Sequence, residues 1–414
     1  MIDLFDKCLT DAGYFGYYRV NQDNYFTQPI LEGLPGPRMV FRGKEVIMWA
    51  VNNYLGLANN ADIKEVARKS VEKWGTFTPM GSRMLTGNTE QHIALEQKLA
   101  GFLQKPDAIL FNYGYLGVIG TLTALIDKND QIIIDRLSHA SMIDGTMLAS
   151  YGRRFRTFQH NDMADLENQL RESNRYRKGG ILIVTEGVFG MRGDLADLKD
   201  ICELKEKYEA RLFVDDAHGF GVMGKNGRGL GEHAGVQDKI DLYFGTFAKA
   251  FAAIGGVAAG EEAPIEYIRY NARTQVFAKS LPMLFIDVLS ASLDLVANQP
   301  ELREKMWYIT RRLQNGLLEL GYDIGDSRSP ITPVYVPAGD AETGMAMIKM
   351  LREEYGIFVS GVTYPVVPKG VVLFRMIPTA SHTDEDVTKT LDAYRQLRDR
   401  LKLDLSLKPS LINQ

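Results

Sequence analysis

Short apolar runs that alternate with helical patterns restrict the fold of this chain more than any other feature. Residues 90–103 carry the apolar stripe of a helix, and residues 114–125 form a second helix rich in small and apolar residues. The last predicted helix starts at Thr383, where Asp386 completes a capping-box pattern. Apolar strands separated by helices pair in a mostly parallel sheet that helices flank. The sequence therefore predicts an α/β fold, with strands at residues 108–111, 132–135, 181–185, 212–215, 242–245 and 256–259.

Chemically active side chains follow several of these predicted strands. In sheets of this kind, ligands bind at the carboxyl ends of the strands. We therefore expect one site that several strand ends build together. Its candidate residues are Asn112 to Tyr115, His139, Glu186, Asp215, His218 and Lys249.

The length of the chain suits two domains. It has 414 residues, 45% of them hydrophobic, which is enough for a large core. A boundary is predicted near Asn298-Gln299-Pro300, where a new helical pattern begins. We expect an N-terminal arm over residues 1–55, a large domain over residues 56–298, and a smaller C-terminal domain over residues 299–414 that packs with the arm. The arm is rich in aromatic residues, which either contact a partner subunit or belong to a solvated loop.

Charge and cysteine content argue against several classes of protein. A net charge of −4 and a pI near 6.0 indicate no affinity for nucleic acid. Cys8 and Cys202 lie far apart and outside any Cys-x-x-Cys motif, so we expect neither a disulfide nor a zinc site, which suits a reducing cytosol. The N-terminus lacks the apolar segment of a signal peptide, and no apolar run reaches the ~18 residues of a membrane span. We expect a cytoplasmic protein without a transmembrane segment, and leave open a peripheral location at a membrane.

Lys249 stands alone among small and apolar residues after the predicted strand 242–245. Desolvation disfavours its ammonium form and leaves an amine that can attack a carbonyl carbon, which is what a Schiff-base lysine needs. Thr246, three residues earlier, offers a hydroxyl group to a phosphate. Taken alone, the segment 245–250 favours a simpler interpretation, a surface lysine on a loop between a strand and a helix.

A second motif changes that interpretation. The apolar run 212–215 ends in Asp215-Asp216-Ala217-His218, some thirty residues before Gly245-Thr246-Phe247-Ala248-Lys249. These motifs resemble those of the α-oxoamine synthases, which are pyridoxal 5'-phosphate (PLP) enzymes of fold type I that join an amino acid to an acyl thioester. The resemblance extends from about Tyr17 to about Arg400. It implies a large domain with a mostly parallel sheet between helices and a smaller C-terminal α/β domain.

The resemblance implies a role for each residue around the PLP ring. Lys249 is the amine that binds PLP as a Schiff base and the base that removes the Cα proton of the amino acid, while Asp215 keeps the pyridine nitrogen protonated. His139 stacks on the ring, and His218 approaches the phenolic oxygen. Asp216 is the alternative to Asp215, but neighbouring residues on a strand point to opposite faces. A metal site at this aspartate pair would lack further ligands, and we expect no metal.

The PLP phosphate needs a separate cradle. Gly114-Tyr115 opens the predicted helix 114–125, and the amides at a helix N-terminus can face an anion. The resemblance implies that this pair binds the phosphate together with Thr246, and a plain helix start is the alternative. The remaining histidines receive no role in the chemistry: His92, His160, His233, and His382, which is expected to support the last helix.

Three residues are expected to bind the substrate. Arg375 interrupts an apolar strand at residues 371–377, and a buried arginine needs an anionic partner. By resemblance that partner is the carboxylate of the amino acid, held in a bidentate contact with help from Asn52; a structural ion pair is the alternative. The segments 81–87 and 277–282, the second of which contains Lys279, resemble loops that complete the active site of the neighbouring subunit. They imply an obligate homodimer with shared sites.

The expected reaction is a decarboxylative condensation of serine or cysteate with a long-chain fatty acyl thioester, which gives a 3-keto amino lipid. Gly190 and Ala248 stand where many relatives have serine, and Lys279 stands where they have a small residue. These differences leave open the amino acid (serine, cysteate, glycine or alanine), the acyl length and the carrier, coenzyme A or acyl-carrier protein. The alternatives are glycine C-acetyltransferase, 8-amino-7-oxononanoate synthase, an aminotransferase and a non-catalytic partner subunit.

Overall fold

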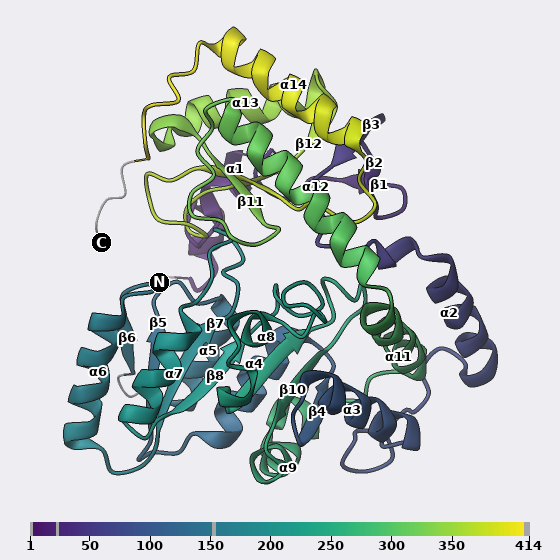
Figure 1. Ribbon diagram of the computed structural model, residues 1–414, viewed down its shortest axis with the longest axis vertical. Coiled ribbons are helices and arrows are strands. Elements are labelled where there is room, and N and C mark those ends of the chain that lie inside the picture. Colours follow the sequence, from purple (N-terminus) through teal and green to yellow (C-terminus); the bar gives the residue numbers. More distant parts are fainter. Residues whose placement is uncertain (1–2, 22–24, 151–154, 410–414) are drawn as a thin grey trace. The chain divides into compact units, whose positions relative to one another are not determined.

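The computed structural model describes residues 3–21, 25–150 and 155–409, and the chain divides into two compact units (Figure 1). The large unit comprises Asn52–Gly190 and Asp194–Arg303. The C-terminal unit comprises Met1–Val51, Met191–Gly193 and Glu304–Gln414. The domain boundaries expected after residues 55 and 298 stay predictions.

A seven-stranded sheet forms the centre of the large unit, with the order β4-β10-β9-β8-β7-β5-β6 among the described residues. All neighbouring pairs are parallel except those of β10, which runs antiparallel to both β4 and β9. The strands are β4 (Asp107–Phe111), β5 (Gln131–Asp135), β6 (Arg156–Phe158), β7 (Ile181–Glu186), β8 (Arg211–Asp215), β9 (Leu242–Thr246) and β10 (Gly256–Gly260).

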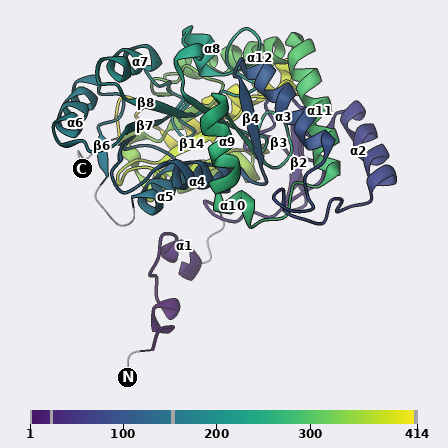
Figure 2. The same ribbon diagram turned by 90° about the horizontal axis from the view of Figure 1, so that it is seen from below.

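Helices cover both faces of this sheet, as Figure 2 shows with α6 and α7 on one face and α4, α5 and α9 on the other. Because both faces are covered, the central strands are continuous apolar runs; every residue of β7 is buried. The elements of the large unit are η2 (Leu57–Asn59), α2 (Ala61–Trp74), α3 (Glu90–Leu103), α4 (Gly114–Leu125), α5 (Ala140–Ala149), α6 (Met163–Tyr176), α7 (Leu198–Lys207), α8 (Leu230–Ala234), η3 (Gln237–Lys239), α9 (Glu262–Asn271), α10 (Arg273–Val276) and α11 (Met283–Asn298).

The C-terminal unit contains two smaller sheets, ordered β1-β2-β3-β12 and β11-β14-β13. Helix α14 begins at Thr383 with a complete capping box to Asp386, which confirms the predicted helix start. The core of this unit contains Trp49, whose ring stacks on His382 at 3.8 Å between ring centroids. Its elements are η1 (Asp6–Leu9), α1 (Gly16–Asn21), β1 (Leu31–Glu32), β2 (Arg38–Phe41), β3 (Lys44–Met48), β11 (Thr332–Tyr335), η4 (Pro337–Gly339), α13 (Ala341–Glu353), β12 (Ile357–Phe358), β13 (Ser360–Val362), β14 (Leu373–Met376) and α14 (Asp384–Leu401), with α12 (Pro300–Glu319) running from the large unit into this one.

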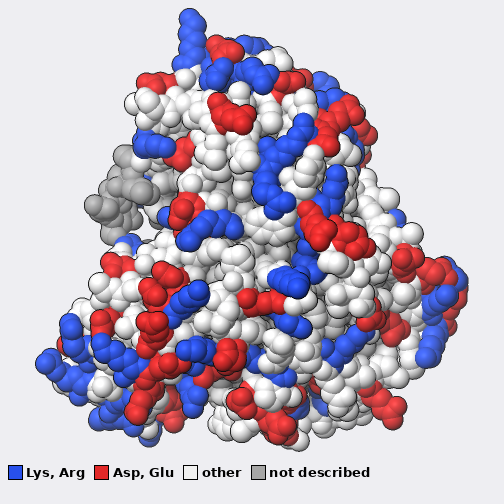
Figure 3. Space-filling view, in the orientation of Figure 1, with Lys and Arg blue, Asp and Glu red and all other residues white. Residues whose placement is uncertain are grey.

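The α/β fold with a mostly parallel sheet between helices is confirmed. In the part of the chain that the structure describes, no helix combines the length and the apolar character needed to cross a membrane. Figure 3 shows basic and acidic side chains interspersed on the face drawn, in a chain of net charge −4.

Candidate active site

The ends of three parallel strands bring the predicted site residues of the large unit together. Glu186 at the end of β7 pairs in register with Asp215 at the end of β8, and Asp215 pairs in register with Phe244 of β9. Thr246 ends β9, and Lys249 follows three residues later. The sheet register therefore places two carboxyl groups side by side, next to the loop that carries the lysine.

Asp215 is a buried carboxyl group whose charge interacts with a lysine and a histidine. Only 5% of its surface is exposed, and it accepts one backbone hydrogen bond, from Ala217 at 3.1 Å. Burial raises the pKa of Asp215, while the charges of Lys249 and His139 act in the opposite direction. A protonated ring nitrogen would supply a further opposite charge, so Asp215 fits the partner that a PLP ring needs.

Asp216 is separated from this role by its own contacts. It is fully buried and accepts hydrogen bonds from the Leu230 backbone at 2.6 Å and the Tyr243 hydroxyl at 3.2 Å. Burial raises the pKa of Asp216 to about 7. The two aspartates thus have different surroundings, as strand alternation predicts.

His139 is the N-cap residue of helix α5 and keeps part of its surface exposed. Its Nδ1 accepts the backbone N–H of Ser141 at 3.2 Å and lies 2.8 Å from the Ser141 hydroxyl oxygen. Partial burial lowers the pKa of His139, and the charge of Asp215 opposes that shift. A histidine held in place through Nδ1, with surface open to a ligand, fits a ring that stacks on a cofactor.

His218 is buried and hydrogen-bonded on one side. Its Nδ1 lies 2.8 Å from the hydroxyl oxygen of Tyr54. On the other side, a Cβ atom added to Gly190 would lie 2.5 Å from Nε2, so glycine at position 190 leaves the space that His218 fills. Sequence analysis assigned no role to Tyr54, although it lies two residues after the candidate residue Asn52.

The residues predicted to bind the phosphate lie close together. Gly114 is the first residue of α4, and a Cβ atom at this position would lie 2.7 Å from Oγ1 of Thr246. The close approach therefore requires glycine, and it sets the hydroxyl of Thr246 beside a helix N-terminus, which favours an anion. The Tyr115 hydroxyl donates a hydrogen bond to the carboxylate of Asp144. A buried carboxylate, an open histidine face, a lysine and this cradle are together the donor set that PLP requires.

Glu186 belongs to the same cluster, although no specific role was predicted for it. It is 7% exposed and accepts the backbone N–H of Gly190 at 3.2 Å. Burial, helped by the charge of Asp215, raises the pKa of Glu186 to about 8, against the opposing charge of Lys249. This carboxyl group can therefore hold a proton near neutral pH.

The three expected substrate residues lie apart in the chain. Asn52 is half-buried at the start of the large unit. Lys279 is exposed, and its backbone carbonyl accepts a hydrogen bond from the side chain of Asn112. Arg375 on β14 is 6% exposed and lines a cavity of about 960 Å³ within the C-terminal unit. Their roles stay predictions.

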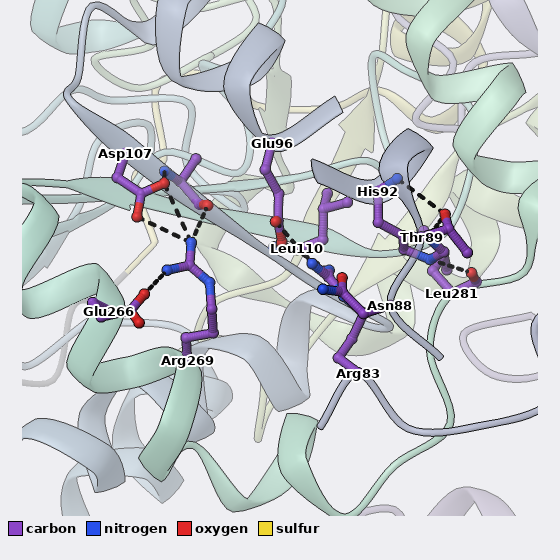
Figure 4. Close-up of polar contacts among 11 residues, drawn as sticks. Arg83, Asn88, Thr89, His92, Glu96, Asp107, Leu110, Glu266, Arg269 and Leu281 are labelled. Atoms are coloured by element: carbon purple, nitrogen blue, oxygen red, sulfur yellow. Dashed lines mark hydrogen bonds and ion pairs between the residues drawn. The ribbon is translucent and has the colours of Figure 1, made fainter. Parts of the chain in front are cut away.

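The two segments expected to reach a neighbouring subunit are joined to each other. The backbone N–H of Ser280 donates to the carbonyl of Gly81 at 2.9 Å. Arg83 does not extend outward: it forms two hydrogen bonds to the buried carboxylate of Glu96, at 2.8 and 2.9 Å (Figure 4). Figure 4 also shows His92, whose Nε2 lies 2.8 Å from the carbonyl oxygen of Leu281. Segments 81–87 and 277–282 therefore form one anchored surface, on which Leu85 and Phe277 are mostly exposed.

The chain matches known proteins over almost its whole length. The family model for aminotransferase class I and II matches residues 44–393. A cysteate-C-fatty acyltransferase from Capnocytophaga ochracea is 46% identical over 97% of this chain and 96% of that protein. A serine palmitoyltransferase from Bacteriovorax stolpii is 40% identical over 91% of this chain and 88% of that protein.

Solved structures of related enzymes share the fold. Serine palmitoyltransferase from Sphingomonas wittichii has a TM-score of 0.88 and 30% identity, over 97% of this chain and 99% of that one. A serine palmitoyltransferase structure that contains PLP has a TM-score of 0.89 and 30% identity, over 97% of this chain and 100% of that one. The sequence similarity, the fold and the donor set agree, and the chain belongs to the α-oxoamine synthases, PLP-dependent C-acyltransferases of the class I and II aminotransferase family.

Proposed function

We propose that this chain condenses an amino acid with a long-chain acyl thioester, with L-cysteate as the first choice of amino acid and L-serine as the second. Cα forms a bond to the acyl carbon, the carbon–sulfur bond of the thioester breaks, and the thiol leaves. The carboxyl group leaves as CO₂, and a proton replaces it on Cα. The observation that carries the proposal is the cluster of Lys249, Asp215 and His139 at neighbouring strand ends.

PLP, when bound, supplies an aldehyde for the amino group and a ring that withdraws electrons from Cα. Around it, Lys249 removes the Cα proton and later returns one, because its amine lies within the electrostatic reach of Asp215 and Glu186. Asp215 keeps the ring nitrogen protonated, and His139 covers the ring. His218 approaches the phenolic oxygen, while Gly114, Tyr115 and Thr246 bind the phosphate.

The size and the walls of the cavity that Arg375 lines favour a long-chain acyl donor. The volume of about 960 Å³ is near the upper end of the roughly 300–1,000 Å³ range of ligand pockets. Its walls are largely apolar and aromatic, with Arg375 as a cation that binds a carboxylate; they include Phe15, Tyr18, Phe26, Met191, Val362 and Val366. An acetyl donor would leave most of that space empty.

The preference for cysteate rests on Lys279. This exposed lysine lies in the anchored surface that we propose to reach the site of the second subunit of a homodimer. A sulfonate would gain a charge-assisted hydrogen bond of roughly 1.5–3 kcal/mol, which is about one to two decades of affinity, and serine would not. The alternative is a lysine that points to solvent or pairs with the PLP phosphate.

The location also stays a proposal. Cys8 and Cys202 are free thiols in the structure, one exposed and one buried. Free thiols suit a reducing compartment, and we propose the cytoplasm.

Product analysis tests the reaction. The purified enzyme is incubated with a palmitoyl thioester and with L-cysteate, L-serine, glycine or L-alanine, and CO₂ and free thiol are measured. We expect equal amounts of both products, at the highest rate with cysteate. A keto acid without thiol release would indicate an aminotransferase, and no product with any amino acid would indicate a non-catalytic subunit.

Titration of the cofactor absorbance tests Lys279. In the parent enzyme, cysteate is expected to bind at lower concentration than serine, and Lys279→Ala should reduce the ratio of the two affinities. Tighter binding of serine by the parent, or an unchanged ratio in the variant, would remove the support for cysteate.

A further inference from the structure

His160 lies between two buried carboxylates in the large unit. Its Nδ1 is 3.1 Å from Oδ1 of Asp135, and its Nε2 is 2.7 Å from Oδ2 of Asp194. The exposed fractions of the three side chains are 12% for His160, 1% for Asp135 and 6% for Asp194. Ionised carboxylates only accept hydrogen bonds, so both ring nitrogens must donate and the imidazole must carry a proton on each.

Electrostatics agree with this geometry. Burial acts to lower the pKa of His160, but the hydrogen bonds and charges of Asp135 and Asp194 outweigh it and raise the pKa to about 9. Phe189 covers the ring in an edge contact, with 4.4 Å between ring centroids. Among the described residues, the charged groups that face His160 are Asp135 at the end of β5 and Asp194 in the segment after β7.

Asp135 organises the turn that carries His139. One of its carboxylate oxygens accepts the backbone N–H of Leu137 at 2.8 Å, and its carbonyl accepts the N–H of Ser138 at 3.1 Å. The next residue, His139, is the N-cap residue of α5. The turn that leads to His139 is therefore built on the same carboxylate that His160 contacts.

Asp194 ends a hairpin that packs against His218. Val188 and Leu195 form a bridge, and the N–H of Phe189 donates to the carbonyl of Asp194 at 3.0 Å. Between these residues lies Gly190, whose Cα approaches Nε2 of His218 too closely for a Cβ atom. The hairpin therefore forms one wall of the space that His218 occupies.

We propose that His160, as a cation between Asp135 and Asp194, is a positioning residue. It fixes two segments relative to each other: the turn that leads from Asp135 to His139, and the hairpin that packs against His218. The inference rests on the cofactor roles proposed above for these two histidines. Loss of the His160 proton removes one of its two hydrogen bonds and leaves the carboxylates without their counter-charge. Because the folded-state pKa lies above the ordinary 6.5, this stabilisation is complete below pH 6.5 and is lost as the pH rises through about 9.

A titration of the holoenzyme by NMR, with ¹³C-labelled histidine, tests the bridge directly. His160→Gln assigns the His160 signal, and His233→Gln, at an exposed histidine, is the control. We expect His160 to titrate near pH 9 and, in Asp194→Asn, at least about one pH unit lower, because one carboxylate charge is lost. A midpoint between pH 6 and 7 in the parent, or the same midpoint in both proteins, would overturn the proposal.

The pH profile and the circular dichroism of bound PLP test positioning. The alkaline limb of kcat is expected to move in Asp194→Asn by as much as the NMR midpoint moves. His160→Gln should lower kcat at least about tenfold and reduce the dichroism of the PLP band, with little change in KM for the thioester, while His233→Gln changes neither.

If the NMR midpoint of His160 moves in Asp194→Asn while the alkaline limb of kcat and the dichroism of the PLP band stay unchanged, the bridge has a structural role only. That outcome would refute the positioning role. If His160→Gln does not fold, the His160 signal is assigned as the one whose midpoint moves in Asp194→Asn, and the alkaline limb of kcat and the PLP dichroism of Asp194→Asn decide on the positioning role. If the holoenzyme forms no condensation product, the proposed function fails, whereas NMR and dichroism still decide on His160.

Discussion

The hydroxyl oxygen of Tyr54 lies 2.8 Å from Nδ1 of His218, in the interior of the large unit. The two residues are 164 positions apart in the sequence, and their rings meet edge to face at 6.2 Å between centroids. A Cβ atom at Gly190 would lie 2.5 Å from Nε2, so the ring has close neighbours on both sides. We therefore expect Tyr54 to influence how His218 approaches the cofactor.

Replacement of Tyr54 by phenylalanine should release this constraint without creating a cavity. A neutral hydrogen bond contributes about 0.5–1.5 kcal/mol, so we expect PLP affinity to fall roughly twofold to tenfold. The dissociation constant is measured from the absorbance of bound PLP. Tyr176→Phe, at an exposed position on α6, is the control. Equal affinities in Tyr54→Phe and the parent would mean that His218 is positioned by other contacts.

Removal of the Lys249 amine should abolish both covalent PLP binding and turnover. Lys249→Ala is expected to lose the visible band of lysine-bound PLP and the release of thiol, because no other amine of this cluster is available to form a Schiff base with the cofactor. Spectra before and after borohydride reduction, followed by peptide mapping, locate the modified residue. Lys178→Ala, at an exposed lysine, should behave as the parent. A Lys249→Ala protein that keeps the band would disprove the assignment.

Local patterns predicted much of this fold. The stripe over residues 90–103 and the small, apolar segment 114–125 coincide with α3 and α4, since each pattern lies within one helix. The start of α14 was predictable because a capping box needs only Thr383 and Asp386. The antiparallel direction of β10 was open to prediction too: nine residues lie between Thr246 and Gly256, too few for the crossover that a parallel pair requires.

Contacts between distant segments could not be predicted in this way. His160 received no function because a lone histidine carries little information, and its partners Asp135 and Asp194 lie 25 and 34 residues away. Only the parallel pairing of β5 with β6 and β7 brings their ends together. Arg83 was expected to help complete a neighbouring site, yet its guanidinium binds Glu96 inside its own subunit. The exposed side chain of Leu85 in the same loop remains available for a partner.

Loss of the Arg375 guanidinium should weaken amino-acid binding and leave PLP in place. A charge-assisted contact to a carboxylate contributes roughly 1.5–3 kcal/mol, so we expect the affinity of Arg375→Ala for the amino acid to fall about one to two decades. The amino acid is titrated against the cofactor absorbance of the variant. Arg328→Ala, at an exposed position of the same unit, is the matched control. Parallel loss of PLP from Arg375→Ala would indicate a structural ion pair instead.

Two different substitutions on the anchored surface, the segments 81–87 and 277–282, test folding and dimer formation separately. Arg83→Ala leaves the carboxylate of Glu96 buried without its counter-charge, and such losses cost about 3–5 kcal/mol, so the urea midpoint should fall clearly. Arg68→Ala removes an exposed pair on α2 and should leave the midpoint unchanged. Leu85→Asp, in contrast, alters an exposed tip of the surface, so it should shift light scattering from dimer toward monomer, with loss of activity. A fully active monomer, in either the parent or Leu85→Asp, would exclude a site that two subunits share.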